Sequence, residues 1–313
     1  MSAHSEGHLS LGRFVIGPRV QGHVAMTLFA FLISISFFLG KRAAPHIDPS
    51  ALTAVRYMIA IPVMGGFAFF FTPPAAREPL FRPKAIWRFP ILGGLMAIYF
   101  IMMFVALQTA SSVSTGAVIT LMPLMTAIFG FLLLRQKAGV TVMGSLSLAA
   151  LGAVWVIFRG DINAILTFAI GKGELIFFLG VIAHALHNPL VRKLNRGEPT
   201  LVFAFWSSMG AGACLLVFGG PALLSTDWMH LPWIVWLCIA YLGTIATAGC
   251  YFLLQFALLR IPAAKANAYM LLTPSYVIIM EGFAGSGWVS LQVMAGALVT
   301  LIGLAILIAS PEV

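Results

Sequence analysis

Ten runs of roughly 20 apolar residues dominate this sequence, and they constrain the fold more than any motif does. As an α-helix, a run of that length crosses about 30 Å of hydrocarbon. The runs lack the in/out alternation of a transmembrane strand. With 61% hydrophobic and 9% charged residues, the chain cannot hide its apolar surface in a water-facing globule. We therefore expect an all-α polytopic membrane protein with ten transmembrane helices, at about residues 22–40, 51–71, 86–107, 113–134, 140–158, 174–191, 201–220, 231–259, 266–285 and 288–309.

The distribution of Lys and Arg predicts how these helices are oriented. If the N-terminus is cytoplasmic, thirteen of the 18 Lys and Arg residues fall in loops on that side, four fall in the opposite loops, and Arg56 lies inside a helix. The positive-inside rule then places both termini in the cytoplasm. The net charge of +9 is explained by this bias and by attraction to anionic lipid, so no nucleic-acid partner is expected.

A weak internal repeat divides the chain into halves. Residues 106–123 align with residues 257–274, 151 positions later, with five identities in 18 positions. Ten helices in two repeats give five per half, and an odd number inserts the halves in opposite directions. We therefore expect two inverted five-helix repeats. The predicted divisions are a cytoplasmic tail at 1–21, the repeats at 22–158 and 174–309, a connecting loop at 159–173, and a cytoplasmic C-terminus at 310–313.

The repeat also carries a resemblance to a known group. An Ala-Leu pair, a small-residue stretch and then Pro occur in the fourth and ninth segments, ending at Pro123 and Pro274. With the ten-helix architecture, this pattern resembles the drug/metabolite transporter superfamily, in particular its EamA-type exporters, over residues 22–309. The Phe- and Met-rich helices and the Pro-Ser after Thr273 look most like the bacterial aromatic amino acid exporters.

One position departs from the pattern of that superfamily. Many members carry an acidic residue about 13 residues beyond the proline, where this chain has Gln136 and Gly287. The one acid in the ninth segment is Glu281. A charge in hydrocarbon is costly and often functional. Glu281 is either a proton-coupling site or a carboxylate at the rim that is paired with a donor.

Arg56 and Lys265 are the basic residues placed to meet a charged substrate. Arg56 either meets an anionic group or a partner acid, or it reaches the outer headgroups or braces a neighbouring helix. A phosphate-bearing substrate requires a cationic pocket. With two candidate cations, a largely apolar, uncharged or zwitterionic metabolite is preferred.

The sixth segment contains a polar cluster. His184, His187 and Asn188 have i, i+3 and i+4 spacing and share one helical face. They either line the transport path, with the histidines relaying protons, or form a structural network. No third ligand accompanies the His-x-x-His pair, so no metal site and no cofactor are expected. Cys214, Cys238 and Cys250 lack metal-ligand spacing and are interpreted as small buried groups.

The resemblance implies that the first, third, fourth, sixth, eighth and ninth helices line the substrate path. Hydroxyl and aromatic residues in these helices supply ring contacts and hydrogen bonds, or alternatively interhelical packing. Pro123 and Pro274 are expected to supply paired bends or unwound carbonyls and so to take part in gating. The further candidates for substrate binding are Ser34, Tyr99, Thr120, Tyr251, Tyr269 and Thr273.

Small residues recur in the fifth and tenth segments. Gly144, Gly152, Gly296 and Gly303 lie at near-helical spacing, which favours close helix packing. They form either an interface between the halves, which we prefer, or a dimer seam. A monomer or weak homodimer is expected.

These observations favour a carrier over an enzyme or a channel. The sequence has no nucleophile elbow, paired carboxylates, P-loop or dinucleotide turn, and no filter loop or charge ring. We expect a secondary transporter in the bacterial inner membrane that exports small metabolites, amino acids above all, by alternating access, with protons as the coupling ion. The alternatives are a carrier of phosphorylated sugars or nucleotide-sugars, and a membrane-embedded enzyme that uses His184 and His187.

Overall fold

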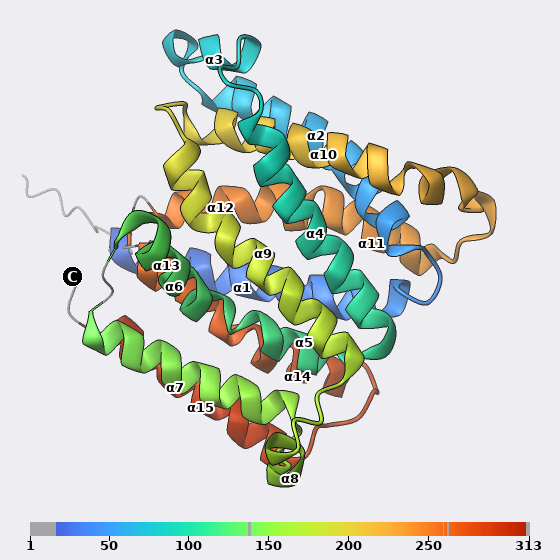
Figure 1. Cartoon of the computed structure of the whole chain (residues 1–313), viewed down its shortest axis with the longest axis vertical. Helices are drawn as coiled ribbons and strands as arrows, with labels where there is room; N and C mark the ends of the chain where they lie inside the picture. The colour runs from blue at the N-terminus through green and yellow to red at the C-terminus, as the bar shows by residue number, and fades with distance from the viewer. Residues whose placement is uncertain (1–16, 137–138, 259, 262, 311–313) are drawn as a thin grey trace, which may run out of the picture.

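Helices make up the regular secondary structure of this protein wherever the structure describes it. The computed structural model describes residues 17–136, 139–258, 260–261 and 263–310, and no strand occurs among them (Figure 1). Most of the predicted N-terminal tail, residues 1–16, and residues 311–313 of the predicted C-terminus lie outside the described residues. The predicted all-α membrane fold is confirmed.

The helices follow the predicted runs closely. Short helices occupy the loops: η1 (Pro74–Ala76), α3 (Glu78–Phe81), α8 (Ile162–Leu166) and η2 (Trp228–His230). The first half contains α1 (Pro18–Ala43), α2 (Pro49–Phe71), α4 (Arg88–Thr109), α5 (Ser112–Ile119), α6 (Met122–Leu134) and α7 (Val140–Ile157). The second half contains α9 (Lys172–Leu194), α10 (Thr200–Ser225), α11 (Trp233–Gly243), the π-helical η3 (Ile245–Gly249), α12 (Cys250–Leu258), α13 (Ala263–Ala268), η4 (Tyr269–Leu272), α14 (Thr273–Phe283) and α15 (Leu291–Ala309).

Two of the predicted spans are interrupted at matching places. Nine helical stretches in the described part of the chain are long and apolar enough to cross a membrane, and the span predicted at 266–285 is not among them. It runs instead as α13, the 3-10 helix η4 and α14. Pro274, in the first turn of α14, has no N–H to continue an α-helical ladder. Pro123 follows the break between α5 and α6 in the same way.

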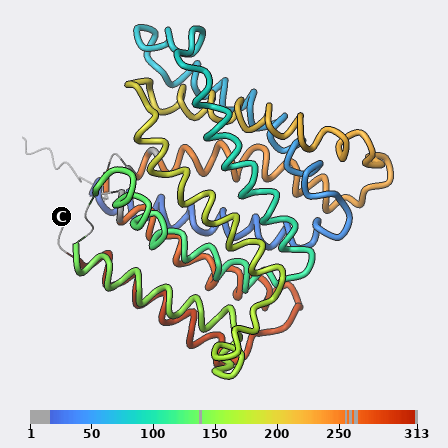
Figure 2. The backbone as a smooth tube through the Cα atoms, in the orientation of Figure 1, coloured from blue at the N-terminus to red at the C-terminus, as the bar shows by residue number. Residues whose placement is uncertain are grey.

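Helix contacts repeat between the two halves. The third span of the first half packs against the first span of the second half, as α4 against α9. With the halves exchanged, the same contact appears as α12 against α1. The last spans, α7 and α15, lie side by side along one edge of the bundle, and α2 and α10 lie toward the opposite edge (Figure 2). The start of α1 and the end of α15 lie at the same end of the bundle (Figure 1).

Small residues allow α7 and α15 to approach closely. A Cβ atom at Gly152 would lie 2.7 Å from the carbonyl oxygen of Gly296, and one at Gly303 would lie 2.8 Å from that of Ser145. The predicted interface between the halves is therefore present. Gly144 takes no part in it, since a Cβ there meets nothing within 4 Å.

Candidate functional site

A central cavity of about 750 Å³ lies between the two halves. Its walls come mainly from α1, α2, α4, α6, α9, α10, η3 and α12, and most of the lining is aromatic, methionine or aliphatic. None of the lining residues in the described part of the chain is Asp or Glu. At one end the cavity reaches Gln136, Asn195 and Thr200, at the loops that join α6 to α7 and α9 to α10.

Five of the nine predicted substrate-binding residues line this cavity: Tyr99, His184, His187, Asn188 and Tyr251. The three residues from the sixth segment share one wall, as their helical spacing predicts. The Asn188 amide donates to the Thr126 hydroxyl at 3.4 Å, and the Tyr251 hydroxyl donates to the carbonyl of Thr200 at 2.8 Å. Polar side chains of α9 and α12 therefore line the same cavity.

The other four predicted binding residues do not line the cavity. Ser34 donates to the carbonyl of Ala30 at 2.7 Å, and Thr120 donates to that of Ala117 at 2.6 Å. Each hydroxyl is therefore used within its own helix. The remaining two are Tyr269, whose hydroxyl lies 2.7 Å from His23 Nδ1, and the fully buried Thr273.

Arg56 lies against the cavity and not among lipid headgroups. The residue is 3% exposed, and its Nε and Nη2 donate to the Thr247 hydroxyl at 3.3 and 3.2 Å. Thr247 is positioned by the π-helical turn of η3, where its hydroxyl donates to the carbonyl of Leu242. The guanidinium stacks on the Phe100 ring, 3.7 Å from its centroid. Nη1 of Arg56 has no hydrogen-bond partner among the described residues.

A chain of rings leads from Arg56 along the cavity wall. Phe100 contacts Tyr99 with ring centroids 4.8 Å apart, and Tyr99 contacts His184 at 4.5 Å. His184 lies 6.1 Å from His187. Nδ1 of each histidine is buried without a hydrogen-bond partner in the described part of the chain. The wall therefore combines a cation, aromatic faces and open polar atoms.

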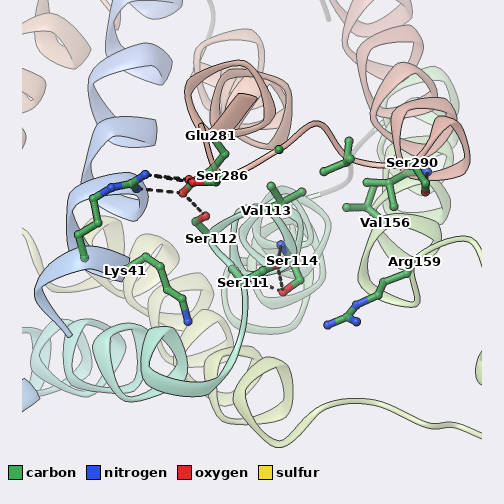
Figure 3. Close-up of a pocket in the computed structure, with 14 residues that line it drawn as sticks. Lys41, Ser111, Ser112, Val113, Ser114, Val156, Arg159, Glu281, Ser286 and Ser290 are labelled. Carbon is green, nitrogen blue, oxygen red and sulfur yellow. Dashed lines mark hydrogen bonds and ion pairs between the residues drawn. The ribbon is translucent and has the colours of Figure 1, made fainter. Parts of the chain in front are cut away.

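A second pocket, of about 580 Å³, lies toward the opposite end of the helices, and its lining includes the ion pair between Arg42 and Glu281. The Glu281 carboxylate accepts from Arg42 Nη2 at 3.0 Å and from Nη1 at 3.2 Å. Ser112 and Ser286 donate to the same carboxylate at 2.6 and 2.8 Å. In Figure 3, Glu281 and Ser112 point toward each other across this contact. The geometry is that of a rim carboxylate paired with donors, which is one of the two roles expected for Glu281.

Lys265 and Lys41 each donate hydrogen bonds to backbone carbonyls at the end of a helix. Lys265 donates to the carbonyls of Ile308 and Ser310 at 2.8 and 2.9 Å, and it does not line the central cavity. Lys41 donates in the same way to the carbonyls of Leu107 and Ala110, at the end of α4. Such cations are stabilised by the negative end of the helix dipole.

The two prolines occupy different surroundings. Pro123 lines the central cavity, at the start of α6. Pro274 lies where α14 crosses α5, with its Cα 3.7 Å from a Cβ built at Gly116. The matching breaks are therefore present, but of the two prolines only Pro123 lines the cavity.

Sequence reasoning missed several residues of both sites. In the sequence, Arg42 is one of the four basic residues in the loops opposite the N-terminus, and no pattern indicates that it pairs with Glu281. Thr247 gave no signal, because a π-helical turn is not visible in the hydropathy pattern. Tyr57 and Phe100 lie on the second and third spans beside Arg56, and their aromatic rings were the only available sign. No group of three metal-ligating side chains occurs among the described residues.

Comparisons with known proteins agree on the family. A profile of the EamA-like transporter family matches residues 20–158 and again residues 171–309. The uncharacterized transporters YyaM and YcxC of Bacillus subtilis (strain 168) are 26% and 25% identical over 288 and 305 residues. Those alignments cover 89% and 91% of this chain and 91% and 92% of the relatives. A crystal structure with a TM-score of 0.64 and 18% identity shares the fold over 93% of this chain and 96% of its own. This chain belongs to the EamA-like transporter family.

Proposed function

We propose that this transporter is a secondary carrier that exports amino acids with apolar or aromatic side chains, and related amphipathic metabolites, across a bacterial inner membrane. The observation that carries the proposal is the central cavity, whose volume of about 750 Å³ suits a small metabolite. Its wall is mostly apolar and aromatic, with polar groups from several helices, α2, α9, α10 and α12 among them. Such a wall matches a substrate with an apolar body and a polar head.

The mechanism we propose is alternating access between the two halves. The cavity reaches the end of the bundle that carries Gln136 and Asn195, and the Arg42–Glu281 pair lies toward the other end. In this proposal the first end faces the cytoplasm, as the positive-inside bias predicts. The cavity then loads substrate from the cytoplasmic side. Release requires the ion pair to part while the cytoplasmic end closes.

Protons are the proposed coupling ion, and Glu281 is the candidate carrier of the proton. Protonation of Glu281 neutralises the carboxylate that holds Arg42, so it favours opening of that end. We expect Glu281→Gln to uncouple efflux from the proton gradient. If proton-coupled efflux in the variant equals that of the wild type, Glu281 has no coupling role.

The two alternatives receive less support from the geometry. A phosphorylated sugar needs more than one cation, and the amine of Lys265 is held by backbone carbonyls outside the cavity. His184 and His187 line the cavity without a carboxylate beside them in the described part of the chain. A general acid–base role would need such a partner or a reactive substrate group.

Export is tested by growth with toxic amino-acid analogues, with and without expression of the protein. We expect resistance to analogues with apolar or aromatic side chains and none to charged ones. Purified protein in liposomes should exchange labelled for unlabelled amino acid without changing it chemically. Resistance to none of the analogues, together with no exchange, would refute the proposal.

A further inference from the structure

We infer that Arg56 is the anchor for a single carboxylate, and that the central cavity recognises its substrate as a monocarboxylate with an apolar or aromatic body. This inference deepens the proposed function and rests on it for the location of the substrate. The inference goes beyond the proposed function because it assigns the substrate's carboxylate, and not its ammonium group, as the charge that the cavity binds.

The first argument is the state of the guanidinium. Arg56 is nearly completely buried, and no ion pair to it occurs among the described residues. Its Nε and Nη2 donate to Thr247, while Nη1 is buried without a hydrogen-bond partner among the described residues. A buried cation with an unpaired donor is costly unless an anion reaches it. Since Arg56 is part of the cavity lining, a substrate carboxylate that reaches it from the cavity would supply this missing partner.

The charged side chains of the wall suit one negative charge. Among the described residues, no Asp or Glu lines the cavity, so an ammonium group meets no carboxylate from them there. Besides Arg56, this described lining contains one other Arg and no Lys: Arg192, at the mouth, whose Nη1 donates to Gln136 at 3.4 Å. One deep cation with one open donor nitrogen suits one negative charge. A phosphate dianion would require a second cation at the same depth.

The third argument is the position of the rings. Phe100 stacks on Arg56 and is followed along the wall by Tyr99 and His184. A substrate whose carboxylate touches Arg56 therefore has aromatic faces directly beside its body. Ser36 adds a buried hydroxyl without a hydrogen-bond partner in the described residues, from α1 on the cavity wall.

The test uses four ligands that share a phenyl ring: 3-phenylpropionate, L-phenylalanine, phenethylamine and phenyl phosphate. Binding is measured as the rise in melting temperature of the purified protein in detergent, over a range of ligand concentrations. We expect 3-phenylpropionate and phenylalanine to raise the melting temperature, and phenethylamine to have no effect at the same concentrations. Phenyl phosphate should bind more weakly than 3-phenylpropionate.

Arg56→Gln should weaken binding of both carboxylates by about ten- to 100-fold, the range for a charge-assisted hydrogen bond. Arg56→Lys keeps the charge and should retain part of the affinity. Arg82→Gln removes the same charge from an exposed loop position and should leave binding unchanged. The wild-type ligand series tests the inference even if Arg56→Gln does not fold.

Failure of the inference differs from failure of the proposed function. Equal binding of the amine and the acid by the wild type, or tighter binding of the aryl phosphate, would overturn the carboxylate site. So would undiminished carboxylate binding by a folded Arg56→Gln variant. Binding of 3-phenylpropionate without any amino-acid exchange in liposomes would instead remove amino-acid export and leave the site standing.

Discussion

Loss of the Glu281 charge is expected to favour opening of the end of the transporter where Glu281 pairs with Arg42, if the proposed mechanism holds. In Glu281→Gln, the side chain keeps its shape but no longer attracts the guanidinium of Arg42. The amide nitrogen of the new Gln also replaces a carboxylate oxygen, so a hydrogen-bond donor stands where the donors of Arg42 need an acceptor. If the pair must part during transport, the variant lowers the stability of the closed end and leaves the opposite conformation unaffected.

The size of this effect follows from the burial of the pair. Removing one charge costs about 0–1 kcal/mol for an exposed ion pair and about 3–5 kcal/mol for a buried one. The side chains of Glu281 and Arg42 are 11% and 29% exposed, which is between these limits. We therefore expect about 2 kcal/mol, equivalent to roughly a 30-fold shift in the conformational equilibrium.

Cys250 provides the assay, because it lines the central cavity and is 2% exposed. Cys214→Ser and Cys238→Ala leave it as the single thiol. Its labelling by a membrane-impermeant maleimide, applied to right-side-out vesicles, then reports access from the periplasmic side. Labelling should be slow with Glu281 intact and up to about 30-fold faster in Glu281→Gln, if it follows the open population.

Glu198→Gln is the matched control. Glu198 pairs with Arg88 at the opposite end of the bundle, and its side chain is 9% exposed, close to that of Glu281. It removes the same kind of charge without touching the proposed gate. Unchanged labelling in Glu281→Gln would refute the gating argument. Equal acceleration in both variants would mean that the bundle had only loosened.

Two further predictions concern stability. In SDS unfolding, Gly152→Ala should be less stable than Gly144→Ala by about 1–3 kcal/mol, because the methyl group added at Gly152 meets the backbone of α15 and the one added at Gly144 meets nothing. Both variants gain the same helix propensity, so this gain cancels in the comparison. Equal stabilities of the two variants would show that α7 and α15 can separate freely. For Glu198, burial raises the pKa, but hydrogen bonds from Arg88 and backbone N–H groups lower it more, and the net pKa is below its ordinary value of 4.5. A carboxyl with a lowered pKa stabilises the fold above its ordinary pKa, so the stability difference between wild type and Glu198→Gln should narrow as the pH falls below 4.5. A difference that stays constant down to pH 3 would contradict this assignment.

Length and hydropathy predicted most of the fold, because a bilayer demands continuous apolar helices. The fifth span, predicted at 140–158, is α7 at Val140–Ile157, and the second, predicted at 51–71, is α2 at Pro49–Phe71. The interruptions were harder to predict. Hydropathy does not distinguish an α-helical turn from a 3-10 or π-helical turn. The composition of the chain therefore did not predict the 3-10 helix η4 or the π-helix η3.

Residues of the candidate site could be predicted where helical spacing alone decides which way their side chains point. His184, His187 and Asn188 face the cavity together because they share one face of a helix. Ser34 and Thr120 failed as cavity residues because depth in the membrane does not reveal which way a hydroxyl points. Each instead donates to a carbonyl three or four residues earlier.

The repeat explains why the ion pair between Arg42 and Glu281 has no counterpart at the equivalent position of the other half. α1 and α9 end 151 residues apart, which is the offset of the repeat, so the basic pair at 41–42 corresponds to the pair at 192–193. Both ends thus present two cations at the end of an equivalent helix. The same offset pairs Glu281 with Gly130, which lines the cavity near its mouth. Arg192 Nη1 donates to the neutral Gln136 at this end, and no ion pair to Arg192 occurs among the described residues. In the proposed closure of the cavity mouth, the position equivalent to Glu281 therefore supplies no carboxylate, and this charge asymmetry favours the conformation in which Arg42 and Glu281 are paired.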